Sequence, residues 1–305
     1  MSQMSSNPPI SVVAAAYNAQ RYLAEMLDSY LAQTFGDFEL VVVDDGSTDA
    51  TGEILRSYAQ KDSRLKVVSI QHAGIVGAAN AGLQAARAEL IARADADDIA
   101  MPNRLQKQFD FMRERPEVVA VGSRMILIEP YGSPLFTTEH VLDHESIDAG
   151  LMRGGGWMMP QPAAMIRREP TLRVGAYRKE YEWSEDLDLF LRLAEVGRLA
   201  NIAEPLVKYR IHPNSSNHTK REIQQQLKRK LVAEAYARRG LQMPAELQFK
   251  MRPMESEADR YTIWTWAALK DKNIRGARRH ALAALRLRPL NVNTWRAAYC
   301  ALRGH

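Results

Sequence analysis

Three aspartates stand within four positions, directly after a hydrophobic run, in the segment IARADADDI (91–99). Carboxylates packed this closely repel one another, so the arrangement needs a partner that offsets their charge. Asp95, Asp97 and Asp98 offer the hard oxygen ligands that Mg²⁺ and Mn²⁺ prefer, and such a site commonly also takes phosphate oxygens from a substrate. The spacing therefore predicts a divalent-cation site, with Mn²⁺ or Mg²⁺ as the cofactor.

A calcium-binding loop is the alternative reading of these acids. Such a loop needs glycine at its sixth position and glutamate at its twelfth. A loop that starts at Asp95 would place Ala100 and Gln106 there, so the segment does not match. A helix start capped by Asp98 would explain one aspartate but not three.

Two further acidic pairs are suited to chemistry. Asp44 and Asp45, in the segment DDGS, follow a valine-rich run, where a carboxylate can accept hydrogen bonds from a nucleobase or a ribose hydroxyl. The same segment could also be an ordinary turn. Glu185 and Asp186 open an amphipathic segment, where an acid could act as a general base or could simply be favoured by the helix dipole.

The first hundred residues alternate between two kinds of hydrophobic pattern. Short apolar runs predict strands at 10–18, 38–49, 64–70 and 89–95. The segments between them predict helices at 19–33, 50–60 and 74–88. This alternation predicts a parallel, doubly wound sheet, in which ligands bind beyond the carboxyl ends of the strands. Asp44 and Asp95 stand at such ends, so we expect them at one edge of the sheet.

The rest of the chain predicts further helices and strands around a glycine-rich loop. We expect helices at 101–116 and 183–197, strands at 118–130 and at the start of 206–218, and mostly helix in 219–305. The loop GGGWMMPQP carries Trp157, whose ring offers a flat face to a bound ligand, while the glycines offer hinge freedom. A plain connecting loop with a packed tryptophan is the alternative.

Four segments, in this order, resemble one known family: VVAAAYNAQRYLAEMLDSYLAQTFGDFELVVVDDGSTDAT, ELIARADADDIAMPNRLQKQ, WSEDLDLFLRLAEVG and YRIH. Over roughly residues 10–215 the chain is similar to the family 2 glycosyltransferases, which are inverting enzymes of the GT-A fold that use nucleotide sugars. The resemblance implies an α/β fold, namely a GT-A-like, doubly wound, mainly parallel sheet with a helical C-terminal extension.

The resemblance also implies roles for the acids. Asp44, together with Asp45, matches the position that contacts the base and ribose. Asp97 matches the metal ligand of the family's DxD motif, and Asp95 lies nearer the ribose and phosphates while sharing the metal. Asp186 matches the general base.

Several further positions follow from the same resemblance. Glu185 would help to position the acceptor, and His212 of YRIH would be a further metal or phosphate contact. The loop with Trp157 would cover the acceptor, with the tryptophan ring against a sugar. The implied nucleotide-sugar site is completed by a set of neighbouring positions: Ala15, Tyr17, Asn18, Asn80, Arg93 and Ala96. Many family members carry Arg-Asn where this chain has Ala79-Asn80, so we expect Arg93 to supply the cation that faces the diphosphate.

Charge is distributed unevenly along the chain. Residues 221–305 hold 18 Lys and Arg against 7 Asp and Glu, whereas residues 1–220 hold 23 against 29. A basic tail of this kind predicts an anionic partner surface. Residues 220–305 could contact an anionic membrane, with their basic residues at the lipid headgroups and their tryptophans at the interface. Alternatively, they could form a tetratricopeptide-like helical unit that packs on protein. No nucleic-acid-binding motif accompanies the charge, so nucleic acid is not expected.

The sequence indicates a cytoplasmic protein. The first nine residues lack the charged and apolar regions of a signal peptide, and Cys300 stands alone, so no internal disulfide can form. No run of about 18 apolar residues predicts a membrane span. We therefore expect a cytoplasmic location, with peripheral binding to the inner face of the cytoplasmic membrane as an extension of that prediction.

These observations predict a GT-A-like domain in residues 1–219 and a basic helical region in 220–305. Within the first, the nucleotide-sugar half is about 1–100 and the acceptor half about 101–219. The expected activity is inverting transfer of a sugar, most simply from a UDP-sugar, to a glycan or lipid-linked acceptor in cell-surface polysaccharide synthesis. A nucleotidyltransferase and a catalytically silent sugar-binding or scaffold protein are the alternatives.

Overall fold

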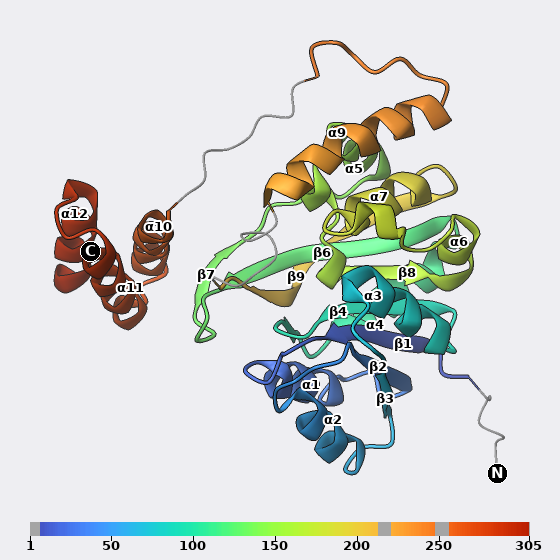
Figure 1. Cartoon of the computed structure of the whole chain (residues 1–305), viewed down its shortest axis with the longest axis horizontal. Coiled ribbons are helices and arrows are strands. Elements are labelled where there is room, and N and C mark those ends of the chain that lie inside the picture. Colours follow the sequence, from blue (N-terminus) through green and yellow to red (C-terminus); the bar gives the residue numbers. More distant parts are fainter. Residues whose placement is uncertain (1–6, 213–220, 248–255, 305) are drawn as a thin grey trace. The chain divides into compact units, whose positions relative to one another are not determined.

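The computed structural model describes residues 7–212, 221–247 and 256–304. Its strands form one sheet of nine, in the order β3-β2-β1-β4-β8-β6-β9-β5, with β7 paired to β6 (Figure 1). The strands have the following bounds: β1 (Ile10–Ala16), β2 (Phe38–Asp44), β3 (Leu65–Ser69), β4 (Leu90–Asp95), β5 (Ile99–Ala100), β6 (Val118–Ile128), β7 (Pro134–Thr137), β8 (Met165–Arg167) and β9 (Arg198–Arg210).

Helices connect these strands and cover the sheet. The α-helices have the following bounds: α1 (Leu23–Leu31), α2 (Thr51–Ala59), α3 (Gly74–Ala85), α4 (Arg104–Glu114), α5 (His144–Leu151), α6 (Arg168–Arg173), α7 (Glu185–Leu193), α9 (Arg221–Arg238), α10 (Glu257–Lys270), α11 (Ile274–Leu287) and α12 (Val292–Arg303). Three short 3₁₀ turns are η1 (Gly156–Met158), η2 (Gln161–Ala163) and η3 (Lys179–Tyr181).

The core has two layers because alternate residues of each central strand face opposite sides of the sheet. In β1, Val12 and Ala14 pack with α1 and α4. Val13 faces the other way and packs with α3 and α7. Near-continuous apolar strands are expected where helices cover both faces, and they account for the valine-rich runs in the sequence.

Strands β1 to β4 pair in parallel, as the alternating pattern predicts. The short strand β8 then joins β4 and β6 in antiparallel pairing, and β5 pairs antiparallel with β9. The predicted α/β class, with C-terminal helices, is confirmed.

The register of the parallel strands brings two of the acidic segments together. Ala16 at the end of β1 pairs with Asp44 at the end of β2. On the other side of β1, Ala15 pairs with Asp95 at the end of β4. Asp44 and Asp95 therefore lie at the same edge of the sheet, on either side of β1, as their positions after strands predict.

The contacts divide the chain into two compact units. The first comprises residues 1–125, 139–208 and 220–249, and the second comprises 126–138, 209–219 and 250–305. This division differs from the boundary predicted after residue 219. The leucines and alanines on one side of α9 pack in the core of the first unit, whereas the hairpin formed by the end of β6 and β7 packs with the second.

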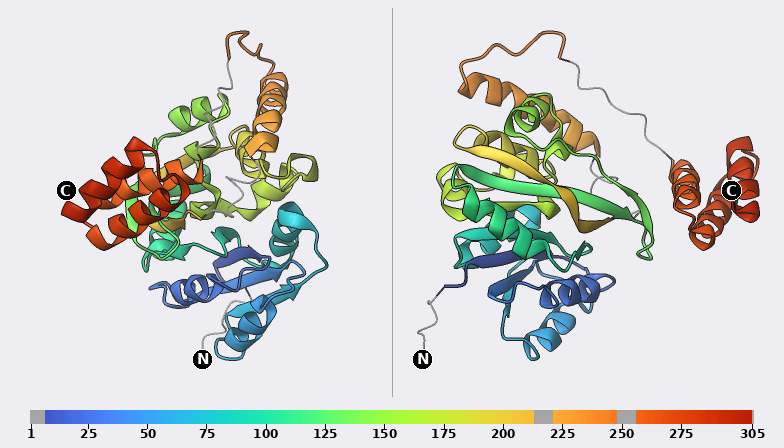
Figure 2. Two further views of the ribbon diagram at one scale, coloured as in Figure 1. Left: turned by 60° about the vertical axis from the view of Figure 1, so that its left-hand side comes forward. Right: turned by 180° about the vertical axis from the view of Figure 1, so that it is seen from behind.

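The second unit consists of that hairpin and three helices. Helices α10, α11 and α12 pack side by side (Figure 2), and the contact is made of small residues, namely Ala268, Ala277, Ala281, Ala298 and Ala301. Leu127 and Leu135 of the hairpin pack against Trp264 of α10. An ion pair between the buried Glu129 and the partly exposed Arg279, with an O···N distance of 2.7 Å, joins the same hairpin to α11.

Within the described parts of the chain, no helix combines the length and the apolar character that crossing a bilayer requires.

Glu39 ties together the edge of the sheet opposite the acidic segments. Its side chain is buried and accepts hydrogen bonds from the Ser11 hydroxyl (2.6 Å), the Lys66 ammonium (2.7 Å) and the Arg87 guanidinium (2.9 Å). These donors come from β1, β3 and the segment after α3. They lower the pKa of Glu39 from 4.5 to about 2, although burial alone would raise it.

Replacing this carboxylate tests its contribution to stability. We expect Glu39→Gln to lower the free energy of unfolding at pH 7 by about 2 kcal/mol, allowing for the exposure of Lys66 and Arg87. Because the folded-state pKa lies below the ordinary value, the stabilisation is present above pH 4.5 and is lost as the pH falls towards 2. Thermal melts of both proteins across this range should therefore converge at low pH.

Glu53→Gln is the matched control, because it removes an exposed carboxylate from α2. It should change the melting temperature little at any pH. Equal melting of wild type and Glu39→Gln at pH 7 would contradict the role given to Glu39.

Candidate active site

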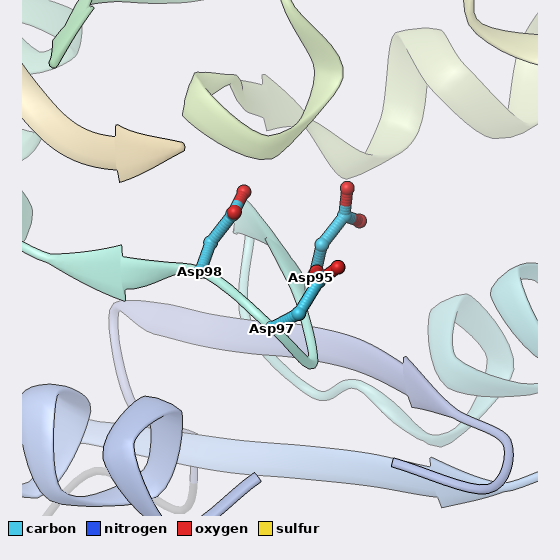
Figure 3. Close-up of side chains that lie close together, drawn as sticks. All are labelled: Asp95, Asp97 and Asp98. Atoms are coloured by element: carbon cyan, nitrogen blue, oxygen red, sulfur yellow. The ribbon is translucent and has the colours of Figure 1, made fainter. Parts of the chain in front are cut away.

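The acidic cluster occupies the turn between β4 and β5. Asp95 ends β4, and the backbone N–H of Asp98 donates to the carbonyl of Asp95 at 3.3 Å, which closes the turn. One carboxylate oxygen from each of Asp95, Asp97 and Asp98 lies within 4.8 Å of the other two (Figure 3). Three hard oxygens this close together fit a divalent cation such as Mg²⁺ or Mn²⁺.

The surroundings of the cluster disfavour its negative charge. Desolvation raises the pKa of Asp95 to about 6, and repulsion from Asp97 adds to the effect. The positive charge of Arg93 opposes this shift, and Asp186 contributes further repulsion. The nearby positive charges thus offset only part of the repulsion among these carboxylates, as expected of a site that binds a cation.

Two buried arginines lie under the cluster. Arg93 is 1% exposed, donates to the carbonyl of Val13 at 3.3 Å, and lies 5.4 Å from the ring centre of Tyr177. Arg104 is fully buried and donates to the carbonyl of Arg93 at 2.7 Å. Sequence reasoning did not single out Arg104, although the segment MPNRLQKQ contains it.

The expectation that Arg93 faces the diphosphate directly is therefore corrected. Asp95 and Arg93 are two positions apart on β4, but the guanidinium is enclosed by protein and stacks on an aromatic ring. Its positive charge acts on the site through Asp95, whose pKa it lowers.

The start of α7 brings a second pair of acids to the same site. Glu185 is the first residue of α7, and repulsion from Asp95 contributes to its raised pKa. Repulsion from Asp186, the next residue, contributes to the raised pKa of Asp95. Burial is the largest cause of the raised pKa of Glu185, which reaches about 8, followed by repulsion from Asp186. Residues about ninety positions apart in sequence therefore lie close enough to affect each other's protonation.

Asp186 has the same kind of environment with more compensation. Burial raises its pKa, while the backbone N–H of Leu187, which donates to Asp186 Oδ1 at 2.7 Å, and the charge of Lys228 oppose the shift. Lys228 lies on α9, which packs along α7 (Figure 1). Lys228 was not predicted as part of the site, because the sequence analysis assigns the residues of α9 to the C-terminal region.

The glycine-rich segment borders Asp186. A Cβ placed on Gly156 would lie 3.8 Å from Asp186 Oδ2, so the backbone of η1 approaches this carboxylate closely. Trp157 is the next residue and is 44% exposed. The segment that follows is not free to move as a whole, because η2 is buried in the first unit. The role of Trp157 at the acceptor remains a proposal.

The carboxylates of Asp44 and Asp45 accept hydrogen bonds from different parts of the chain. Asp44 Oδ1 accepts a hydrogen bond from the backbone N–H of Ser47 at 3.1 Å. Asp45 is buried and accepts from the backbone N–H groups of Ala73 (2.7 Å) and Gly74 (3.0 Å) at the start of α3. Asp45 therefore fixes the start of α3, while Asp44 lies at the carboxyl end of β2.

The loop after β1 is tied to the loop after β2. Asn18 accepts from the backbone N–H of Thr48 at 2.9 Å and donates its own N–H to the Ser47 hydroxyl at 3.1 Å. Tyr17 is 50% exposed, and its ring stacks on His72 with a centroid separation of 4.2 Å. His72 was not predicted, although it follows the strand at 64–70 and so belongs to the same edge.

Three other predicted positions make contacts within the protein itself. Asn80 uses both ends of its amide on the backbone of Tyr177, at 2.8 and 3.1 Å. Ala15 pairs with strands on both sides, and Ala96 lies between Asp95 and Asp97 and packs on the core. Asn80 thus holds the ring on which Arg93 stacks, and its predicted contact with the nucleotide remains a prediction.

His212 follows β9 and belongs to the second unit. Its predicted contact with a metal ion or a phosphate therefore remains a prediction. The asparagines and serines that come after it in the predicted polar loop lie outside the described residues.

A buried ionic network fixes α7. Asp188 is 1% exposed and binds the guanidinium groups of both Arg178 and Arg192, the latter at 2.5 Å. Arg178 also pairs with Glu234 of α9 at 3.2 Å, and Glu234 accepts a hydrogen bond from Tyr181. The network joins α7 to α9 and so holds the helix that presents Glu185 and Asp186.

Removing the central carboxylate should destabilise this arrangement. Asp188→Asn leaves two cations without their shared partner, and we expect the free energy of unfolding to fall by about 3 kcal/mol. Chemical denaturation followed by circular dichroism would measure the loss. The matched control is Glu145→Gln, which breaks only the exposed pair with Arg198 and should cost at most about 1 kcal/mol. Similar losses in both variants would contradict the account.

Comparison with known proteins identifies the fold and its family. Residues 11–174 match the family model described as glycosyl transferase family 2. This range includes Asp44, Asp95 and Asp97 but ends before Asp186. An uncharacterised glycosyltransferase of Haemophilus influenzae is 31% identical over 245 residues, which cover 75% of each chain. Other relatives carry names that refer to O-antigen and teichuronic acid biosynthesis.

Two solved structures share the fold at lower sequence identity. TarS of Staphylococcus aureus, in complex with UDP-GlcNAc, has a TM-score of 0.58 and 20% identity, covering 96% of this chain and 89% of that one. The mannosyltransferase PcManGT of Pyrobaculum calidifontis, in complex with GDP-mannose and Mn²⁺, has a TM-score of 0.56 and 21% identity, covering 98% and 86%.

The family match spans more than half of the chain and includes the strand-end acids, so a nucleotidyltransferase is not retained. The chain belongs to glycosyltransferase family 2.

Proposed function

We propose that this glycosyltransferase is an inverting enzyme that depends on a divalent cation, Mn²⁺ or Mg²⁺, and transfers a sugar from a nucleoside diphosphate to an acceptor hydroxyl. The observation that carries the proposal is the convergence of the Asp95–Asp97–Asp98 cluster with Glu185 and Asp186 at the start of α7. Burying these acids costs free energy, and a catalytically silent protein would have no use for them that explains this cost.

Asp97 and Asp95 would hold the cation, with Asp98 completing the carboxylate set. When bound, the cation supplies positive charge to the departing diphosphate as a Lewis acid. Arg93 and Arg104 stay buried beneath and limit the repulsion among the aspartates, because both lower the pKa of Asp95. His212 is proposed as a further contact on the metal or phosphate side.

Asp186 would act as the general base. It takes the proton of the acceptor hydroxyl while that oxygen forms a bond to the anomeric carbon, and the bond from this carbon to the diphosphate oxygen breaks. A single displacement of this kind inverts the anomeric configuration. Glu185, whose pKa is about 8, is mostly protonated at pH 7 and can donate a hydrogen bond to the acceptor. The two carboxyls share their protons as a coupled pair.

The donor nucleotide would bind at the edge formed by β1, β2 and β4. Asp44 would accept hydrogen bonds from the base or ribose; it ends β2, beside the loop that carries Tyr17 and Asn18. We propose a UDP-sugar as the donor. The UDP-GlcNAc bound by TarS supports this choice, and the GDP-mannose bound by PcManGT is the alternative to test.

The acceptor is proposed to be a glycan or lipid-linked hydroxyl in cell-surface polysaccharide synthesis. The names of relatives in O-antigen and teichuronic acid biosynthesis support this class. Trp157, beside the segment that borders Asp186, would offer its exposed ring to the acceptor sugar. A lipid-linked acceptor would place the enzyme at the inner face of the cytoplasmic membrane.

The cation site is tested by removing Asp97. Because a carboxylate ligand is lost, we expect Asp97→Ala to weaken Mn²⁺-dependent binding of UDP by about tenfold or more. Isothermal titration calorimetry with and without Mn²⁺ measures this. Asp110→Ala, which removes an acid from α4 outside the cluster, should bind as wild type does. Unchanged affinity in Asp97→Ala would remove this residue from the metal site.

The base is tested by comparing two neighbouring substitutions. We expect Asp186→Asn to lower kcat by about 10²–10⁴-fold while donor binding is kept, because the proton acceptor is lost. Glu185→Gln should retain more activity, since an amide can still donate a hydrogen bond. Steady-state assays with a donor screen would measure both, and NMR of the product would report its anomeric configuration. If Glu185→Gln is the inactive variant and Asp186→Asn turns over normally, the assignment is reversed.

A further inference from the structure

Helix α12 carries a row of large apolar side chains on its outer side. Val292, Trp295, Tyr299 and Leu302 are 79%, 58%, 58% and 67% exposed, and Leu290, just before the helix, is 95% exposed. We call these five residues the α12 face. The four that belong to α12 are spaced three and four positions apart, which places them along one side of the helix.

The side of α12 that is buried is made of small residues. Thr294, Ala297, Ala298 and Ala301 are the buried positions, and the alanines pack with those of α10 and α11. A helix normally buries its large apolar residues and exposes its polar ones. In α12 the larger apolar groups point outward, and a contiguous exposed apolar row marks an interaction surface.

The helix that presents this face is well defined within the second unit. Asn291 caps its start by accepting hydrogen bonds from the backbone N–H groups of Asn293 and Thr294. Gly304 ends it in the left-handed conformation at φ 84°. Arg278 of α11 donates to the carbonyls of Ala301 and Leu302 at 3.1 and 2.9 Å. The exposed row is therefore held by caps and packing that do not use its own side chains.

The segment that carries the face has only cationic charges, two of which, Arg279 and Arg288, pair with Glu129 and Asp259 outside it. Residues 272–305 contain eight Lys and Arg and no Asp or Glu. Arg296 and Arg303 lie on α12 beside the apolar row, and Arg303 donates to the Tyr299 hydroxyl at 2.9 Å. Arg286 and Arg296 lie within 4 Å of no carboxylate among the described residues. The charge that complements this surface is negative.

We propose that the α12 face is a docking surface for an anionic lipid bilayer, on which α12 lies in the interface. The apolar row would enter the boundary between headgroups and acyl chains while the arginines remain at the headgroups. The indole N–H of Trp295 already donates to the carbonyl of Pro289 at 2.6 Å, so placing its ring in an apolar layer leaves no donor unpaired.

A lipid surface fits these observations better than a protein partner does. A specific protein interface uses charges of both signs to fix register and orientation, whereas this segment has only one sign. Lipid headgroups need no register, and a uniform positive charge with exposed aromatic and aliphatic side chains is what an interfacial helix presents. The proposal goes beyond sugar transfer and concerns residues outside the acidic site.

The test is co-sedimentation of the full chain with vesicles of two compositions. Wild type should bind vesicles of phosphatidylcholine mixed with phosphatidylglycerol, and should bind pure phosphatidylcholine at least about tenfold more weakly. The double variant Val292→Ser/Leu302→Ser should lose about tenfold or more of the binding to the mixed vesicles. Arg296→Gln/Arg303→Gln should lose about tenfold or more, because each basic residue near an anionic surface contributes roughly a fivefold factor.

The matched control removes two exposed apolar side chains elsewhere. Leu172→Ser/Val196→Ser changes two residues of the first unit that are 41% and 40% exposed, and it should bind vesicles as wild type does. Circular dichroism would verify that every variant remains folded. Hydrolysis of a free nucleotide sugar, assayed in the same samples without vesicles, reports on the proposed enzyme activity independently of membrane binding.

Three results would overturn the proposal. The first is wild-type protein that fails to bind the anionic vesicles. The second is equal binding by the α12-face variants and the Leu172→Ser/Val196→Ser control. The third is a self-associated wild type that Val292→Ser/Leu302→Ser converts to monomer in analytical ultracentrifugation without any change in vesicle binding, which would make the face an interface between copies of the chain.

Discussion

The repulsion among buried carboxylates is the constraint on which the rest of the site depends. Asp95, Glu185 and Asp186 have pKa values raised by burial. Repulsion from Asp186 adds to the shift of the other two, and repulsion from Asp95 adds to that of Glu185. Placing such groups together costs free energy unless protons, buried cations or bound ions offset their charge. The chain supplies part of this compensation with arginines under the cluster, and leaves the remainder to what binds there.

The scaffold can be understood as the means of holding these acids in place. The parallel register of β1, β2 and β4 sets Asp44 and Asp95 at one edge, and Glu39 secures the opposite edge. Asp188 and its arginines fix the helix that carries the proposed base. Because the acids come from three different elements, β2, β4 and α7, the strength of the site depends on the rigidity of the whole first unit.

The parts of this arrangement that follow from local pattern were predictable. Apolar runs that end in aspartates place Asp44 and Asp95 at the carboxyl ends of parallel strands, and the sheet confirms this. No local pattern could place Glu185 and Asp186 near Asp95, so that proximity was expected only from the family resemblance. It depends on tertiary packing of α7, which the electrostatic coupling of these acids now supports.

Other features escaped sequence reasoning for identifiable physical reasons. Arg93 was expected at the diphosphate, but strand alternation cannot reveal that Tyr177 and Arg104 enclose it. Helix α9 joins the first unit through leucines and alanines, while its many charges suggested a separate basic tail.

The most direct test of the central claim is a crystal structure with UDP and Mn²⁺, with the ion located by its anomalous scattering. The account predicts an ion coordinated by the Asp97 carboxylate and the diphosphate, next to Asp95, with Asp186 facing the space where the acceptor must enter. An ion bound away from Asp95 and Asp97, or an Asp186 side chain turned away from that space, would contradict it.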